Sequence, residues 1–133
     1  MTKKEITIED VQAHCLAQFP DFMQSLYGGD TFSMNDRFIS FSGFADYLIG
    51  EGFKKNNQAL IQKIADYINL LLAEGDEWVR NPVYVSFIEG LVDRAHRMNQ
   101  YPQLKDFIRQ MPEDVRTFIK GFFIKEVLVA LEL

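Results

Sequence analysis

The chain has 133 residues, 47% of them hydrophobic and 25% charged, and a formal net charge of −5. This length and balance predict one globular domain with a single buried core and exclude a disordered chain. The acidic charge argues against direct nucleic-acid binding, for which a basic stripe is the usual footprint. The single cysteine, Cys15, excludes an internal disulfide and fits a reducing compartment.

No targeting or membrane-spanning segment is expected. The start of the chain, MTKKEITIEDVQ, contains two lysines but no apolar run behind them. The longest apolar patches, such as INLLLA, are too short to cross a bilayer. We therefore expect a cytoplasmic protein without a membrane partner.

The first predicted helix begins at a capping box and ends at a proline. Thr7 and Asp10 have the capping-box spacing, with Asp in place of the usual Glu, and Pro20 ends the helix. A short amphipathic piece follows over residues 21–27, and the glycine pair after it is a breaker. Residues 30–37 are polar and predict irregular structure.

Two further helices are predicted in the middle of the chain. Apolar residues recur at helical spacing within residues 41–53, and Gly50 and Gly52 are expected to end that helix. The next helix lies within residues 56–75, with an asparagine cap at its start and Gly75 in the place of a left-handed C-terminal residue. Its broad apolar stripe consists of Leu60, Ile61, Ile64, Ala65, Ile68, Leu71 and Leu72.

The segment AEGDEWVRNP, residues 73–82, forms the corner between this helix and the next. Asp76 and Glu77 suit the start of the second helix, where carboxylates meet free backbone N–H groups. Two long helices joined by one or two residues must form an antiparallel hairpin. Pro82 leaves two alternatives: it lies inside a continuous helix and kinks it, or it begins a fresh helix capped by Asn81.

The C-terminal part predicts two more helices. One covers roughly residues 103–110, and Pro112 divides it from a last helix over residues 113–133. Together the elements predict an all-α fold, a stack of antiparallel helical hairpins resembling a helical-repeat bundle of about six helices, in one domain over residues 1–133. The apolar last helix can contribute to self-association, so we expect a monomer or a weak homodimer. Its stripe is Val115, Phe118, Ile119, Phe122, Phe123, Val127 and Leu131.

The residues that perform catalysis in other proteins are few here and poorly placed. His14 and His96 lie far apart, and neither has metal-ligand spacing to a further ligand. His14 adjoins Cys15, but neighbouring side chains on a helix point about 100° apart. A dyad of Cys15 and His96 would require the fold to bring them together. We therefore expect no enzyme activity, no metal and no cofactor, and a small buried thiol at Cys15.

Paired carboxylates and glycine-rich runs have a structural explanation. The carboxylate pairs lie at predicted helix starts, where they cap backbone N–H groups. The glycines are not followed by a lysine and a hydroxyl residue, so they do not form a phosphate loop. The pairs are Glu9 and Asp10, Asp76 and Glu77, and Glu113 and Asp114.

The distribution of charge favours a basic protein partner. Residues 1–50 hold seven acidic residues against three basic ones, an excess of four out of the net five. Complementary charge speeds association and helps to select a partner, although the same charges also serve solubility. Tyr27, Trp78 and Tyr101 lie at the ends of predicted elements, where aromatic side chains often contact a partner. Trp78 can instead plug the hairpin corner.

Residues 68–91, INLLLAEGDEWVRNPVYVSFIEGL, resemble the signature of small all-α immunity proteins of bacterial contact-dependent inhibition and polymorphic toxin systems. In that family an EGD-x-x-V-x-N corner leads from an apolar helix into a V-x-V-x-F-hydrophobic-E-x-L helix. Pro82 departs from the pattern, so Trp78 and Arg80 are not carried over as contacts. The matching positions are Glu74, Gly75, Asp76, Val79, Asn81, Val83, Val85, Phe87, Ile88, Glu89 and Leu91.

The resemblance implies a protein that binds and neutralises a cognate toxin domain, often a nuclease, by stoichiometric contact. An acidic surface can cover the basic cleft of such a partner. A helical scaffold or adaptor without a toxin partner is the alternative. The residues expected to bind the toxin are Asp30, Asp36, Asp46, Glu74, Asp76 and Glu77.

Overall fold

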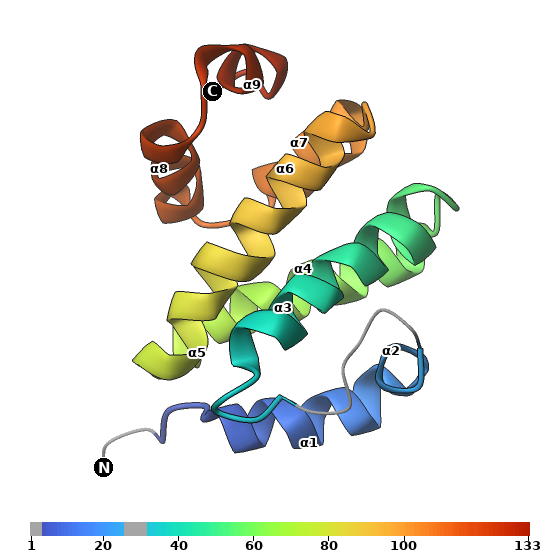
Figure 1. Cartoon of the computed structure of the whole chain (residues 1–133), viewed down its shortest axis with the longest axis vertical. Coiled ribbons are helices and arrows are strands. Elements are labelled where there is room, and N and C mark those ends of the chain that lie inside the picture. Colours follow the sequence, from blue (N-terminus) through green and yellow to red (C-terminus); the bar gives the residue numbers. More distant parts are fainter. Residues whose placement is uncertain (1–3, 26–31) are drawn as a thin grey trace.

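The computed structural model describes residues 4–25 and 32–133, and its regular structure is helical (Figure 1). The predicted all-α class is confirmed, and the only strand-like pairing in the described ranges is an isolated bridge between Ile6 and Gly75. The predicted breaker at the glycine pair and Asp30 lie outside the described residues. In chain order the elements are α1 (Ile8–Gln18), α2 (Pro20–Met23), α3 (Arg37–Tyr47), η1 (Leu48–Phe53), α4 (Gln58–Glu74), α5 (Glu77–Pro82), η2 (Val83–Ile88), α6 (Glu89–Arg97), α7 (Tyr101–Arg109), α8 (Glu113–Phe122) and α9 (Lys125–Ala130).

Three helices begin at the side-chain caps that the sequence predicts. At α1 the Asp10 carboxylate accepts from the Thr7 N–H at 2.9 Å, and the Thr7 hydroxyl accepts from the Asp10 N–H at 3.3 Å. Asn57 caps α4 and Asp76 caps α5, each accepting from the backbone N–H three residues later, at 3.2 and 3.0 Å. Each cap satisfies a donor that the first helical turn leaves free, so these starts are fixed locally.

The helix expected to end at Gly50 and Gly52 instead passes through both, so that expectation is wrong. α3 runs directly into η1, a six-residue π-helical stretch in which these glycines lie. The wider turn keeps the backbone bonded: the Lys54 N–H donates to the Ile49 carbonyl at 2.9 Å, five residues back. Gly52 is buried, and a Cβ there would lie 3.1 Å from Ile61 of α4. Its missing side chain lets η1 pack closely on α4.

Pro82 lies inside one continuous helix, formed by α5, η2 and α6. This helix begins after the Asp76 cap, and no fresh helix begins at Asn81, so the first of the two alternatives holds. Proline has no N–H, so the carbonyl of Trp78 lacks its usual intrahelical donor. The π-helical turn of η2 follows Pro82 at once, and we attribute this local widening to the missing hydrogen bond.

Gly75 turns the chain between α4 and α5 in an extended conformation. Its φ of −71° and ψ of 150° show that the expected left-handed conformation is wrong. Ile6 holds it there: the Ile6 N–H donates to the Glu74 carbonyl at 2.8 Å, and the Ile6 carbonyl accepts from the Asp76 N–H at 2.9 Å. Glycine is required for space, because a Cβ would lie 2.5 Å from the Leu71 carbonyl oxygen and 2.9 Å from a valine methyl of α5.

α3 occupies the centre of the molecule, and Phe44 on it is the hub of an aromatic core. α3 contacts η1, α5, η2 and α6, and Figure 1 shows α3–η1 and α4 running in opposite directions. The chain also reverses at the predicted hairpin corner, where α4 contacts α5 and η2. Phe44 is fully buried, and six ring centroids lie 5.0–6.5 Å from its own. These rings belong to Phe19, Phe22, Phe32, Tyr47, Tyr67 and Phe87.

The predicted last helix is divided into two, so the expectation of one helix over residues 113–133 is wrong. α8 ends at Phe122, and Phe123 and Ile124 are extended, with ψ of 156° and 159°, before α9 begins. Phe122, expected in the core, is 55% exposed. The far end of the chain is tied to α7, because Glu132 accepts from Lys105 at 3.2 Å.

Replacing Gly75 by alanine tests the close approach at the corner. We expect Gly75→Ala to lower the free energy of unfolding by about 1–3 kcal/mol, the usual cost of overpacking a filled site. Gly121→Ala on α8 is the matched control, because a Cβ there meets no atom within 4 Å and alanine favours a helix by up to about 1 kcal/mol. Urea unfolding followed by circular dichroism measures both. A Gly75→Ala variant as stable as the parent would contradict the close approach.

Candidate functional site

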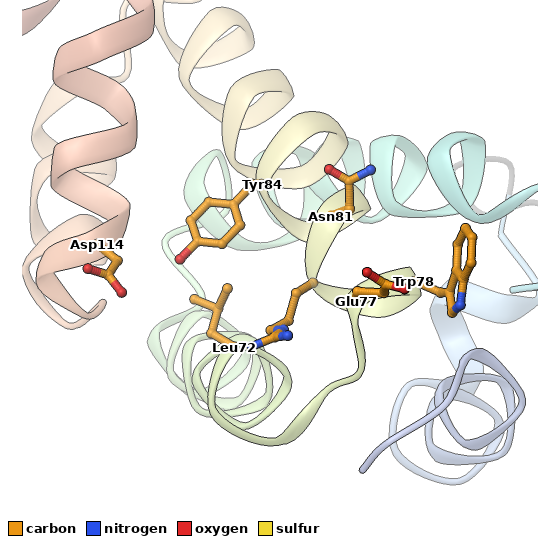
Figure 2. Close-up of a pocket in the computed structure, with 7 residues that line it drawn as sticks. Leu72, Glu77, Trp78, Asn81, Tyr84 and Asp114 are labelled. Atoms are coloured by element: carbon orange, nitrogen blue, oxygen red, sulfur yellow. The ribbon is translucent and has the colours of Figure 1, made fainter.

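An open depression lies at the hairpin corner, where α4, α5, η2 and the start of α8 meet (Figure 2). Its volume is about 480 Å³. Four of its residues come from α5, and the others come one each from α4, η2 and α8. We call it the corner depression, lined by Leu72, Glu77, Trp78, Arg80, Asn81, Tyr84 and Asp114.

Helical spacing brings three of the seven lining residues together. Glu77, Asn81 and Tyr84 are four and three residues apart, so they share one face of the α5–η2 helix. Asp114 lies in the first turn of α8, and Figure 2 shows it across from Tyr84, with Leu72 nearby. The sequence indicated Asp114 only as a helix-start carboxylate. Nothing in the local pattern shows that α8 packs beside η2, so this part of the site was missed.

The charges of the corner depression suit binding. Partial burial, followed by the Asp114 carboxylate, raises the pKa of Tyr84, while the Arg80 guanidinium opposes this shift. The phenol therefore stays protonated and can donate a hydrogen bond at neutral pH. Arg80 is exposed, and no described residue forms an ion pair with it. The depression thus offers one cation and one phenol beside the carboxylates of Glu77 and Asp114.

Trp78 does not plug the corner, which settles one alternative left by the sequence. Its side chain is 49% exposed, whereas the fully buried Val79 fills the corner. Figure 2 shows Trp78 at the edge of the depression, pointing away from Tyr84 and Asp114. The guanidinium carbon of Arg37, at the start of α3, lies 5.2 Å from the centroid of the indole ring, within cation–π range. Arg37 therefore contacts the ring, about half of which remains accessible to a partner.

The acidic residues predicted to bind a toxin do not form one surface. Glu74, Asp76 and Glu77 gather at the corner, but Asp76 also caps α5. Asp36 is exposed just before α3, where its carboxylate accepts from a serine hydroxyl at 3.1 Å. Asp46 contacts the side chain of Arg94 on α6, 18 residues beyond Asp76 along the continuous helix, so it lies several helical turns from the corner. Asp30 lies outside the described residues.

Asp46 has a structural partner that the sequence did not reveal. Its carboxylate pairs with the guanidinium of Arg94 on α6, which also donates to the Ser42 hydroxyl at 2.7 Å. Gly90 lies one turn before Arg94, and a Cβ there would collide with that guanidinium. The glycine therefore allows Arg94 to fold back onto α3. This contact joins residues 48 positions apart, so no local pattern predicts it.

The cysteine and histidines lie in two separate places. Cys15 on α1 is fully buried, and burial raises the pKa of its thiol to about 12, opposed by a hydrogen bond with Tyr67. The Tyr67 hydroxyl also lies 3.2 Å from His14 Nδ1. His96 is exposed on α6 and bonds to Tyr101, so the structure does not bring Cys15 and His96 together. The described residues contain no group of three or more His, Cys, Asp or Glu placed to hold a metal ion.

The fold and these surfaces define a small all-α domain with an open surface depression at a helical corner. The chain belongs to the family described as Domain of unknown function (DUF7674), whose family model matches residues 13–125. The match runs from α1 to the first residue of α9 and includes the whole corner depression. Neither the curated proteins nor the solved structures include a match to this chain. None of the described helices is long and apolar enough to span a membrane. The resemblance to immunity proteins stays a prediction.

Thiol labelling tests the buried cysteine. We expect Cys15 to resist iodoacetamide in the native protein at mildly alkaline pH, because the thiolate is the reactive form and burial holds the thiol protonated. In urea its pKa returns to about 8.5, and labelling should then be complete. Mass spectrometry of timed samples counts the added groups. Rapid labelling without denaturant would contradict the burial of the thiol.

Removal of the Asp46 carboxylate tests its structural role. The Arg94 side chain is 20% exposed and that of Asp46 45%. Asp46→Ala should therefore lower the free energy of unfolding by an intermediate amount. Loss of an exposed pair costs roughly 0–1 kcal/mol, and breaking a buried pair costs roughly 3–5 kcal/mol. Asp93→Ala is the control, because Asp93 pairs with Arg97 on the surface of α6 and should cost about 0.5 kcal/mol or less. If urea unfolding shows the same loss of stability for Asp46→Ala and Asp93→Ala, the structural role of Asp46 is refuted.

Proposed function

We propose that this domain is a protein-binding module, and in particular an immunity protein that neutralises a cognate bacterial toxin domain by stoichiometric contact. The observation that carries the proposal is the half-exposed Trp78 beside Glu77, at the edge of an open depression of about 480 Å³. The same corner contains the EGD-x-x-V-x-N run that resembles immunity proteins. We infer the toxin from that resemblance and the binding mode from the geometry.

The corner has the physical properties of a binding hot spot. Tryptophan supplies a large contact area with few rotatable bonds and is enriched where partners bind. Trp78 lies in the first turn of α5, which the Asp76 side chain caps. The Arg37 guanidinium contacts its ring. A side chain held in place before binding loses little entropy when the complex forms. The corner is therefore suited to tight contact.

The charge of the chain fits a basic partner. Residues 1–50 contain four more acidic than basic residues. The corner depression adds the exposed carboxylates of Glu77 and Asp114. A nuclease presents a basic cleft to its substrate, and a negative surface is complementary to such a cleft. We propose such a toxin domain as the partner, with neutralisation by occupation of its surface and no covalent step.

Co-expression with the toxin domain encoded by a neighbouring reading frame tests the function. We expect the protein to rescue growth and to co-purify with that domain in equal amounts. Trp78→Ala should weaken binding by roughly 30-fold or more, the effect of losing about 2 kcal/mol at a hot spot. Charge reversal by Glu77→Lys should slow association at low salt. Isothermal titration calorimetry and stopped-flow fluorescence measure the two effects.

Two matched variants serve as controls for this experiment. Leu16→Ala also removes an exposed hydrophobic side chain, 55% exposed, but on α1. Asp66→Lys reverses an exposed charge on α4. Neither should change binding. Absence of both rescue and co-purification would reject the immunity function, whereas binding that is insensitive to Trp78→Ala would reject the corner as its site.

A further inference from the structure

A second depression, of about 280 Å³, lies where α8 ends beside η2 and α6. It shares no lining residue with the corner depression. Its small lining residues are Ser42, Ser86 and Gly90. The Arg94 guanidinium donates to Ser42 and occupies the space beside Gly90, so a partner has access to the rest of the groove. We call it the α8 groove, and its larger side chains are those of Val85, Glu89, Asp93, Phe122 and Phe123.

One wall of the α8 groove is apolar and open to solvent. Val85 is 43% exposed and Phe122 55%. The Phe122 ring stacks on Phe118, with centroids 5.7 Å apart and planes 15° apart, and its centroid lies 5.3 Å from that of Phe123. Phe122 is thus fixed by two neighbours although its outer face is bare. Exposed apolar surface of this kind, bordered by charge, is typical of binding sites.

The groove also carries two carboxylates, and among the described residues only one of them, that of Asp93, is paired with a cation. Glu89 and Asp93 are four residues apart on α6, where like charges repel. Desolvation and then the Asp93 carboxylate raise the pKa of Glu89. The neighbouring cations are already paired, Arg94 with Asp46 and Arg97 with Asp93 at 2.7 Å. Across the described part of the chain, no cation pairs with Glu89.

We propose that the α8 groove binds an arginine side chain, presented by a segment of a partner protein in which apolar residues flank it. The aliphatic stem would lie along Val85, as long cationic side chains do on apolar surfaces. The planar guanidinium would stack on Phe122 and donate to Glu89, which a compact ammonium does less well. Its charge relieves the repulsion between Glu89 and Asp93. This inference goes beyond the proposed function and does not require the partner to be a toxin.

A pair of synthetic peptides tests the groove directly. The probe is acetyl-Ala-Leu-Arg-Leu-Ala-amide, and its control has citrulline, which has nearly the same shape without the charge, in place of arginine. In a titration followed by amide NMR, the arginine peptide should shift the backbone signals of Ser86, Glu89, Gly90 and Asp93 with a millimolar dissociation constant. The citrulline peptide should leave these signals nearly unchanged.

Two substitutions complete the test. Glu89→Gln should weaken binding of the arginine peptide by about fivefold, which corresponds to about 1 kcal/mol for a partly exposed ion pair. Glu77→Gln, at the corner depression, is the matched control and should have no effect. Equal shifts with both peptides, shifts away from the groove, or indifference to Glu89→Gln would overturn the proposal. Because no toxin is present, failure here is distinct from failure of the immunity function.

Discussion

The structure depends on how closely the chain passes itself at Gly75. The backbone N–H and carbonyl of Ile6 bond to the Glu74 carbonyl and the Asp76 N–H on either side of this glycine, and there is no room for a Cβ. The backbone of one residue near the start of the chain therefore fixes the end of α4 and the start of α5. The Asp76 cap then fixes the first turn of α5, so a backbone constraint places Trp78 at the corner and its contact with Arg37 holds the ring there.

The rest of the fold is assembled around α3 by contacts between distant segments. Phe44 contacts rings from the junction of α1 and α2, from α4 and from η2, while Arg94 ties α6 to Asp46 and Ser42. Of the two π-helical stretches, η1 continues α3 directly and η2 packs against it. Gly50 and Gly52 lie within η1, and Pro82 comes directly before η2. These residues weaken an ordinary helix, and the wider turn keeps each helix continuous. Large hydrophobic burial can offset the cost of such local defects.

Local features of the fold were predictable from the sequence, and long-range ones were not. The caps at Thr7 and Asn57 involve residues three positions apart, so the sequence alone predicts them. The extended Gly75 was not predictable, because Ile6 holds it from the other end of the chain. The same limit applies to Asp46. Its charge alone suggested contact with a toxin, but its carboxylate pairs with Arg94 within the chain. Of the candidate site, the sequence predicted the acidic corner but not the contribution of α8.

The two surface depressions depend on different contacts within the fold. The corner residues Glu77 and Trp78 depend on α5 and its cap, which the bridge at Gly75 secures. The α8 groove depends instead on the packing of α8 against η2, made by the ring contact between Tyr84 and Phe118 at 5.3 Å. Because Phe118 also stacks on Phe122, one row of rings runs from the corner depression to the groove. A shift of α8 would therefore change the groove and the Tyr84 side of the corner together, while Trp78 would keep its place.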